Sequence, residues 1–357
     1  MDNNRQSEIG NRKSDLSRYS RQTLISAIGE AGQRRLLDSH VLLVGCGALG
    51  SVLAETLVRA GVGHVRICDR DYIEPNNLQR QVLFDEDDIA ANLPKAEAAQ
   101  RKLARINSDV QVDAIVTDVN HTNIERLADG TDLLLDGTDN FETRFLINDL
   151  AVKSGRPWIY GAVIGSSGLL MPVLPGRTAC LRCVFEAAPP PEMNPTCDTA
   201  GVLAPAVNVV ASMQSLEAMK ILVGALDDVN RHLINIDLWS GRMTSLNVDA
   251  ALEHGDCACC KHARFDYLDG RMSSGTTVLC GRDAVQLTRP GGASIDFGSL
   301  AARLNAVSST PVQFNRFLLR ASFGQRELTL FADGRAIIKG TKDADEAKSL
   351  YARYIGA

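Results

Sequence analysis

The sequence predicts an α/β protein with a Rossmann-like, doubly wound, mostly parallel sheet, an antiparallel extension of that sheet, and a small C-terminal α+β domain. Short apolar runs alternate with helical stretches over the first half of the chain, which is typical of a parallel sheet covered by helices. The glycine-rich turn Gly45-x-Gly47-x-x-Gly50 lies between one such run and a helical stretch. Both observations place ligands at the carboxyl ends of the strands.

The composition argues against a nucleic-acid-binding protein and against a membrane protein. The 357 residues are enough for two or three domains, and 45% of them are apolar. Lys and Arg number 38 against 43 Asp and Glu, and only 5% of residues are aromatic, so nucleic acid is not expected as a partner. The sequence shows no apolar run of membrane-span length and no N-terminal signal segment, so we expect a cytoplasmic protein without membrane contact.

The expected elements follow from the apolar pattern. Residues 1–15 are polar and predict a flexible tail. Helices are expected at 16–38 with a break at Gly29–Gly32, at 51–60, 94–106, 123–127 and 144–153, and at 198–223 with an interruption at Pro205. Strands are expected at 41–44, 64–68, 110–116, 132–136, 158–162, 168–174, 232–237 and 243–248. The Pro-rich residues 187–195 predict an exposed loop.

The pattern of expected strands and helices changes after residue 272, and residues 273–357 predict a separate α+β domain. Its expected elements are strands at 276–280, 285–287 and 312–322, helices at 297–307 and 344–354, and a hairpin over 328–339 that turns on Asp333-Gly334.

The glycine turn is the first part of a predicted nucleotide site. Gly45 permits the tight turn, Gly47 allows close approach of a phosphate or ribose, and Gly50 lets helix and strand pack closely. Asp69 ends the next strand, where its carboxylate can accept hydrogen bonds from ribose hydroxyls. The alternative is a glycine-rich turn that binds no ligand.

Cations and amides further along favour a triphosphate. Asn77, Arg80 and Gln81 follow Asp69 closely, Lys95 opens a helix, and Asp139 lies just past another strand. A triphosphate needs positive charges and a carboxylate that positions Mg²⁺, whereas a nicotinamide cofactor needs neither. Taken singly, Arg80 and Lys95 are also consistent with solvated surface charges.

Two cysteine pairs predict a metal site. Cys180 and Cys183, with Cys257 and Cys260, form two Cys-x-x-Cys knuckles, the ligand set of tetrahedral Zn²⁺. Cys259 is the spare thiol, although spacing alone does not exclude it as a ligand in place of Cys257 or Cys260. A redox role is the alternative, but the sequence around neither pair predicts a thioredoxin-like unit.

Cys197 is a separate case, because it follows the proline loop and precedes a helix. The positive end of a helix favours a thiolate, so Cys197 is a candidate for a covalent role; a structural role is the alternative.

These motifs together resemble the ThiF/MoeB/HesA branch of the ubiquitin-activating-enzyme superfamily. The similar segments cover about residues 16 to 265 and come in the same order: Arg18-Tyr-Ser-Arg21-Gln22, the glycine turn, Asp69, Asn77–Gln81, Pro94-Lys95, Asp136–Asn140, the two cysteine pairs and Thr196–Gly201. The resemblance implies that a ubiquitin-like sulfur-carrier protein ending in Gly-Gly presents its C-terminal carboxylate to MgATP. The products would be an acyl-adenylate and pyrophosphate, and residues 16–272 would be the adenylation domain.

The resemblance also implies roles for single residues. Asp69 would bind ribose, Asn77 would help to orient the phosphate region, Arg80, Gln81 and Lys95 would hold the phosphates, and Asp139 would position Mg²⁺. Arg21 would act from the partner subunit of a homodimer, and Cys197 takes the activated carboxylate or handles sulfur in some members. The implied cofactors are ATP, Mg²⁺ and Zn²⁺.

Two other functions stay open at this point. One is a non-catalytic module that binds a ubiquitin-like protein on a Rossmann scaffold, and the other is an NAD-dependent oxidoreductase. The C-terminal domain lacks the Cys-centred loop of a sulfurtransferase, and a recruitment or assembly role is a hypothesis for it. Neither the carrier nor the pathway, whether thiamine, molybdopterin, cysteine or another thio-product, follows from the sequence.

Overall fold

The computed structural model describes residues 15–187, 200–272, 276–279, 283–287, 295–332 and 334–355. These residues divide into two compact units, of which the first ends at Met272. Each unit has its own sheet and its own hydrophobic core. The glycine turn and the two cysteine pairs lie in the first unit.

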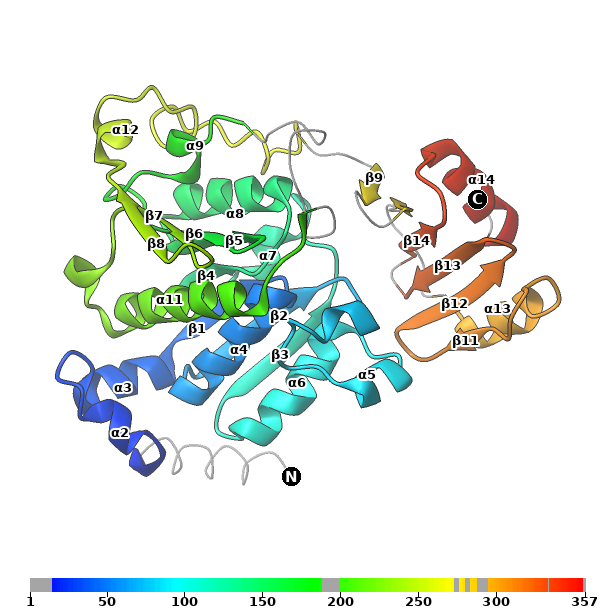
Figure 1. The fold of residues 1–357 in the computed structure, drawn as a ribbon, viewed down its shortest axis with the longest axis horizontal. Coiled ribbons are helices and arrows are strands. Elements are labelled where there is room, and N and C mark those ends of the chain that lie inside the picture. Colours follow the sequence, from blue (N-terminus) through cyan, green and yellow to red (C-terminus); the bar gives the residue numbers. More distant parts are fainter. Residues whose placement is uncertain are drawn as a thin grey trace. The chain divides into compact units, whose positions relative to one another are not determined.

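An eight-stranded sheet organises the first unit, in the order β3-β2-β1-β4-β5-β6-β7-β8. The first five strands in that order are parallel, and β6, β7 and β8 extend the sheet by antiparallel pairing, which confirms the predicted fold class (Figure 1). The strands are β1 (His40–Val44), β2 (His64–Asp69), β3 (Gln111–Val116), β4 (Leu133–Asp136), β5 (Trp158–Ile164), β6 (Ser167–Val173), β7 (Leu233–Asp237) and β8 (Arg242–Leu246).

The strand order locates the ligand crevice. After β1 the chain adds β2 and β3 on one side, and then crosses to the other side of β1 for β4 and β5. The connections that leave β1 and β4 therefore run to opposite sides and open a crevice at the carboxyl ends of these strands. The glycine turn follows β1, and residues 137–140 follow β4.

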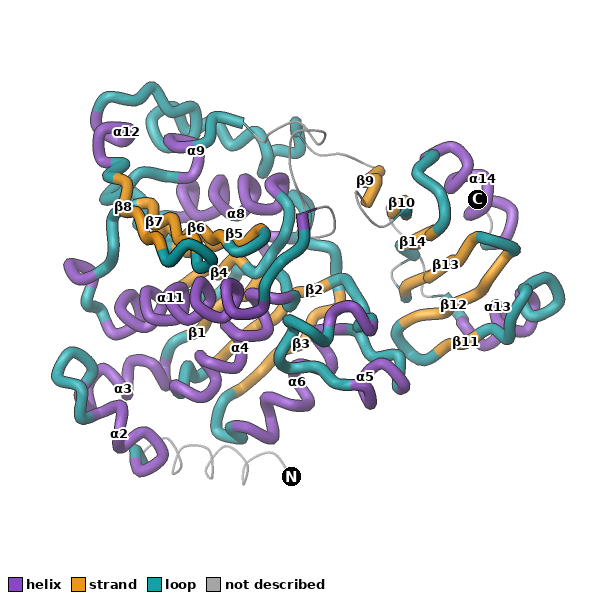
Figure 2. Tube along the Cα trace, in the orientation of Figure 1, coloured by secondary structure: helices purple, strands orange, loops and turns teal. Residues whose placement is uncertain are grey.

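Helices cover both faces of this sheet (Figure 2). A Cβ on Gly161 of β5 would meet Gln214, whereas Trp158 and Tyr160 of the same strand lie in the core on the opposite face. The helices are α2 (Ser20–Thr23), α3 (Gly29–Asp38), α4 (Ala48–Ala60), α5 (Glu86–Ala90), α6 (Lys95–Ile106), α7 (Ile124–Leu127), α8 (Phe141–Ser154), α9 (Leu181–Val184), α11 (Ala204–Val223) and α12 (Asp249–Glu253). The 3-10 turns are η1 (Ser17–Tyr19), η2 (Pro75–Asn77) and η4 (Leu226–Asp228).

Several predicted helices differ from the structure in their bounds. α8 begins at Phe141 and not at residue 144, because Oδ1 of Asn140 accepts a hydrogen bond from the N–H of Thr143 and caps the helix. α11 begins at Ala204, so Pro205 lies in the first turn, where its missing N–H leaves no bond unmade. The predicted break at Gly29–Gly32 is wrong as well, because α3 begins at Gly29 and the break lies at residues 24–28.

The second unit is a six-stranded antiparallel sheet with two helices, which confirms the predicted α+β class. Its strand order is β11-β12-β13-β14-β10-β9, and α13 and α14 pack on one face around a shared core. The elements are β9 (Thr276–Leu279), β10 (Ala284–Leu287), α13 (Phe297–Leu304), β11 (Gln313–Phe314), β12 (Leu318–Phe323), β13 (Arg326–Phe331), β14 (Ala336–Lys339) and α14 (Ala344–Tyr354).

One predicted strand of this unit is wrong. Residues 312–322 form two strands, β11 and β12, because Oδ1 of Asn315 accepts hydrogen bonds from the N–H groups of Phe317 and Leu318 and turns the chain. The predicted hairpin is confirmed as β13 and β14, although Asp333 of its turn lies outside the described residues.

Among the described residues, one helix has the length and composition of a membrane span. This helix is α11, and 61% of its apolar window is buried inside the structure.

Candidate functional site

Close contacts between glycines bring together the turn after β1 and the turn after β4, at the point in the sheet where the strand order reverses. Gly45 has a φ of 87°, and a Cβ on it would lie 2.7 Å from the carbonyl oxygen of Gly137. A Cβ on Gly50 would lie 2.1 Å from the carbonyl oxygen of Gly45. A Cβ on Gly47 would meet nothing nearer than 3.9 Å, so the space beside Gly47 is open at the N-terminus of α4. The turn therefore presents accessible backbone where a helix start favours anions.

The carboxylate of Asp69 is tied to this glycine turn. The N–H of Cys46 donates to its Oδ2 at 2.6 Å, and the N–H of Asp71 donates to its Oδ1 at 2.7 Å. Burial raises the pKa of Asp69, and the nearby charge of Lys95 opposes that rise. Asp69 thus lies at the end of β2 in a position fixed by β1.

Lys95 is buried at the start of α6, with 3% of its surface exposed. Its Nζ lies 3.3 Å from Oδ2 of Asp71, and its N–H donates to the carbonyl of Asp71 at 2.9 Å. Its charge also acts on Asp69 and on the Cys46 thiol of the glycine turn. The interpretation of Lys95 as a solvated surface charge is therefore wrong.

The segment after η2 brings amides and a cation to the same crevice. Gln81 is buried, and its Nε2 lies 3.9 Å from the Cβ position of Gly47. Arg80 is half-buried and donates to the carbonyl of Asn76 at 2.7 Å, with no carboxylate paired to it among the described residues. Asn77 is buried, and its Oδ1 accepts from the N–H of Glu74, so its side chain shapes the loop from inside.

The second turn contains a buried ion pair beside an exposed acid. Arg144 of α8 donates through Nε to Oδ2 of Asp136 at 3.0 Å, and Thr138 donates to the other oxygen of Asp136. Burial raises the pKa of Asp136, and the charge of Arg144 opposes that rise. Asp139 is exposed two residues after Gly137, and its charge acts on Arg144. The geometry thus brings Asp139 to the turn that contacts Gly45.

Arg21 does not lie with these residues. It is exposed on α2, which is anchored to the far end of α4: Nε2 of Gln22 donates to the carbonyl of Ala60 at 3.0 Å, and Tyr19 lies against Gly61. The glycine turn precedes the first residue of α4, and 13 residues of helix span about 20 Å. Arg21 therefore lies too far from the glycine turn to act on a ligand there within one chain.

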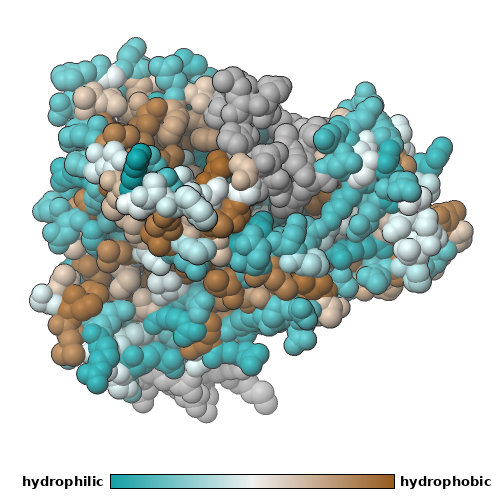
Figure 3. Space-filling model, in the orientation of Figure 1, coloured by the Kyte–Doolittle hydropathy of each residue, from teal (hydrophilic) through white to brown (hydrophobic). Residues whose placement is uncertain are grey.

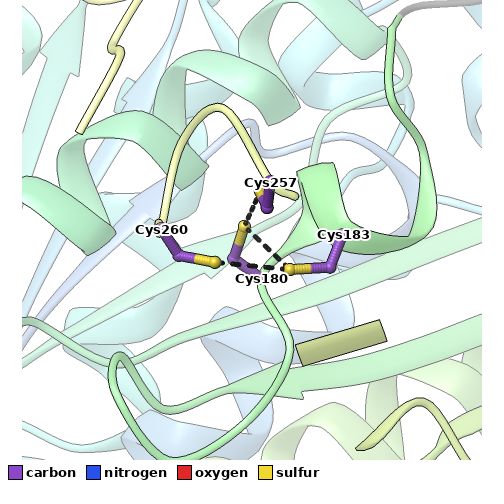
Figure 4. A group of neighbouring side chains, drawn as sticks. All are labelled: Cys180, Cys183, Cys257 and Cys260. Carbon is purple, nitrogen blue, oxygen red and sulfur yellow. Dashed lines mark hydrogen bonds between the residues drawn. The ribbon is translucent and has the colours of Figure 1, made fainter. Parts of the chain in front are cut away.

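The four paired cysteines converge, with all four Sγ atoms within 4.8 Å of one another. They come from α9 and its N-cap and from the loop after α12 (Figure 4). The Sγ atoms of Cys180 and Cys257 are 3.6 Å apart, those of Cys180 and Cys183 are 3.7 Å apart, and those of Cys183 and Cys260 are 3.4 Å apart. Tetrahedral Zn²⁺ with Zn–S bonds of about 2.3 Å needs sulfurs about 3.8 Å apart. The donor set and spacing fit that ion.

Helix α8 makes hydrogen bonds to the segments of both cysteine pairs. Asn148 donates through Nδ2 to Sγ of Cys259 at 3.4 Å, and its Oδ1 accepts from the N–H of Leu181 at 2.8 Å. Asp149 accepts from the N–H of Tyr267 at 2.9 Å. Cys259 also contacts Cys180, but it is engaged by α8 and is not one of the four mutually close thiols. The predicted thiol Cys197 lies outside the described residues.

Sequence reasoning missed several residues of this crevice. Arg70 pairs with Asp118 through Nη1 and Oδ1 at 2.8 Å, and Gln214 donates to the carbonyl of Asp136 at 3.0 Å. Arg144 was also missed as the partner of Asp136. The only available signal was position, because Arg70 and Asp118 each follow a predicted strand end.

Comparisons with known proteins agree on one family. The model of the ThiF family matches residues 19–259. The sulfur carrier protein ThiS adenylyltransferase of Bacillus subtilis is 43% identical over 339 residues, which cover 95% of this chain and 99% of that protein. The sulfur carrier protein adenylyltransferase of Thermus thermophilus is 37% identical over 241 residues, which cover 66% of this chain and 88% of that protein. A crystal structure of E. coli MccB superposes with a TM-score of 0.59 at 25% identity, over 69% of this chain and 75% of MccB.

Proposed function

Because this chain belongs to the ThiF family, we propose that it transfers AMP from MgATP to the C-terminal Gly carboxylate of a ubiquitin-like sulfur-carrier protein and releases pyrophosphate. The observation that carries this proposal is the hydrogen bond between Asp69 and the glycine turn, with the buried Lys95 beside it. We infer that the ribose site and the phosphate site meet at this point of the sheet, where the strand order reverses. The similarity to proteins named adenylyltransferases over nearly the whole chain supports the same reaction.

The reaction needs alignment and charge neutralisation more than a base. A carboxylate oxygen of the carrier forms a bond to the α-phosphorus, and the α–β phosphoanhydride bond breaks, so that pyrophosphate leaves with its electron pair. We assign ribose to Asp69, and the phosphates to Arg80, Gln81, Lys95 and the backbone at Gly47. We expect Arg80 and Lys95 to neutralise the negative charge that develops on the leaving group, so that they act mainly in the transition state.

Asp139 is the proposed holder of Mg²⁺, with Asn77 shaping the loop that carries Arg80 and Gln81. The exposed carboxylate of Asp139, in the turn after β4, offers the oxygen donor that Mg²⁺ prefers. When bound, Mg²⁺ neutralises phosphate charge. Asp139→Asn is expected to raise the Mg²⁺ concentration needed for half-maximal rate.

ATP–pyrophosphate exchange tests this function. Exchange that requires a carrier ending in Gly-Gly is expected for the wild type, and Arg80→Met is expected to lower its rate about 10²-fold. A non-catalytic binding module predicts carrier binding without exchange. An NAD-dependent oxidoreductase predicts that NAD and not MgATP protects the fold from heat.

We further propose a homodimer with two composite sites. Arg21 is too far from the glycine turn of its own chain, and it is exposed next to the loop between α2 and α3. In that loop the surfaces of Leu24 and Ile25 are 74% and 54% exposed, and Figure 3 shows hydrophobic surface there. A partner subunit would cover these apolar side chains and bring in its own arginine.

Mixing of inactive variants tests the composite site. Arg21→Met and Arg80→Met are each expected to be inactive alone, and an equilibrated mixture should regain up to about a quarter of wild-type activity, since half of its dimers are mixed and each mixed dimer has one intact site. A mixture that stays inactive while the chains exchange would contradict the proposal.

The four-cysteine cluster is the proposed structural Zn²⁺ site, with Cys180, Cys183, Cys257 and Cys260 as ligands. All four side chains project into one space, from α9 with its N-cap and from the loop after α12, and a bound ion would join these two segments. The covalent role of Cys197 stays a prediction, and Cys197→Ser tests it by leaving pyrophosphate exchange intact while abolishing any carrier adduct. The cytoplasmic location likewise stays a prediction.

We propose residues 16–272 as the adenylation domain and residues 273–357 as a separate domain. The role of the second domain is open to a deletion test. Unchanged carrier affinity and unchanged exchange after removal of residues 273–357 would exclude a part in recruitment.

A further inference from the structure

Arg70, the residue after Asp69, pairs with Asp118, an acid that has no assigned role in the adenylation reaction. β2 ends at Asp69, and Arg70 is the next residue. Its Nη1 lies 2.8 Å from Oδ1 of Asp118, two residues beyond the end of β3. A single side chain therefore bridges the carboxyl ends of β2 and β3.

The sheet order places this bridge on the path of the nucleotide base. The phosphates belong at the glycine turn after β1 and the ribose at Asp69 after β2, which rests on the proposed function. The base is attached to the ribose at the end opposite the phosphates. It therefore continues past β2 on the side away from β1, and β3 is the neighbour on that side.

A hydrogen bond and a charge contact orient the guanidinium group of Arg70. One carboxylate, Asp118, is bonded to Nη1, and a second, Asp71, lies 3.9 Å from Nε. Hydrogen bonds of a guanidinium lie in its plane, so Asp118 engages the edge of the group, and Asp71 adds a charge contact on the Nε side. The side chains of Arg70 and Asp118 are 24% and 23% exposed, so the pair is partly open to solvent at the carboxyl ends of β2 and β3.

A phosphate role fits this arrangement poorly. The edge of Arg70 that would donate to phosphate oxygens already faces two carboxylates. Lys95 shares Asp71 with Arg70, and it is the charge of Lys95 that acts on Asp69 and on Cys46 of the glycine turn, where the phosphates are expected. A planar cation with its edge held by acids is suited to stacking under an aromatic ring.

We propose that Arg70 is the platform on which the adenine ring of ATP stacks, and that Asp118 is the positioning residue that fixes the plane of that platform.

Two ligands with the same phosphates separate this role from a general electrostatic one. Binding of MgATP and of magnesium tripolyphosphate, which has no base or ribose, is measured by calorimetry on the full chain at physiological salt. Arg70→Lys keeps the charge and the pairing with acids but has no planar face. It is expected to weaken MgATP about five-fold or more, the size of a partly desolvated cation–π contact, and to change tripolyphosphate less than about two-fold.

The control variants sharpen the outcome. Arg80→Met is expected to weaken both ligands, because its target is phosphate. Asp118→Asn keeps an acceptor but removes the charge, and it is expected to weaken MgATP alone, by less than Arg70→Met does. Equal weakening of both ligands by Arg70→Lys and Arg70→Met, or no effect on MgATP, would overturn the proposal. A wild type that binds tripolyphosphate but gains nothing from the adenosine part would overturn the proposed function as well.

Discussion

The N–H of Cys46 donates a 2.6 Å hydrogen bond to Oδ2 of Asp69. This bond joins the turn after β1 to the end of β2, two segments 23 residues apart in the sequence. The carboxylate that is proposed for ribose and the backbone proposed for phosphate are therefore held in one geometry before any ligand arrives. Preorganisation of this kind lowers the cost of aligning a nucleotide for attack.

The glycine turn makes a prediction about two neighbouring glycines. Gly50→Ala is expected to destabilise the fold by about 3 kcal/mol, because the new Cβ would meet backbone that cannot move aside. Gly47→Ala is the matched control, since its Cβ meets no atom closer than 3.9 Å. Urea denaturation should show near wild-type stability for Gly47→Ala, whereas its affinity for MgATP should fall because the methyl group occupies the open space. Equal stability of the two variants would contradict this account.

Asp69 predicts an acid limit for ATP binding. Burial raises its pKa, and Lys95 opposes that effect, so the carboxylate takes up a proton at a higher pH than an ordinary Asp of about 3.9. Affinity for MgATP should fall as the pH drops and Asp69 takes up its proton. Lys95→Met should move the fall to a higher pH, and Asp69→Asn should remove it, which calorimetric titration over a pH series can measure. A fall at the same pH in wild type and in Lys95→Met would contradict the assignment.

The cysteine cluster predicts one Zn²⁺ per chain. Cys260→Ser is expected to lose the metal and to lower the melting temperature, because two loops would no longer be joined. Cys259→Ser is the matched control, since Cys259 accepts a hydrogen bond from Asn148 and is not one of the four mutually close thiols. Elemental analysis and thermal denaturation decide the matter. Metal loss in Cys259→Ser with metal retained in Cys260→Ser would reverse the ligand set.

The parts of the site that sequence predicts best are those fixed by local pattern. The glycine turn and Asp69 are recognisable because each directly follows an apolar run, and parallel strands bring such positions to one edge. The ion pairs of the crevice are different, because Arg70 and Asp118 are 48 residues apart and no period relates them.

Burial is likewise not encoded locally. Lys95 has the surroundings of an exposed helix start in the sequence, but in the folded chain it is buried, and its Nζ contacts Asp71, 24 residues away. The choice between Cys257 and Cys259 as a ligand also depends on geometry, since Cys257 is one of the four mutually close thiols, whereas Cys259 accepts a hydrogen bond from Asn148 of α8.

The buried pair of Asp136 and Arg144 predicts a pH-dependent loss of stability. Arg144→Met leaves the Asp136 carboxylate buried without its cation, which costs about 3 to 5 kcal/mol at neutral pH. Burial already raises the pKa of Asp136, and removal of Arg144 raises it further. A carboxyl whose pKa is higher in the folded state binds a proton more tightly when the protein is folded. Its contribution to the stability of the fold is therefore fully present below the unfolded-state pKa and is lost as the pH rises through the folded-state pKa. Arg144→Met should therefore regain stability on acidification from neutral pH, and Arg144→Met/Asp136→Asn should be more stable than Arg144→Met at neutral pH with a flat profile. Urea denaturation over a pH series measures both effects, and a single variant that loses further stability on acidification would show that Asp136 is not the group left unpaired.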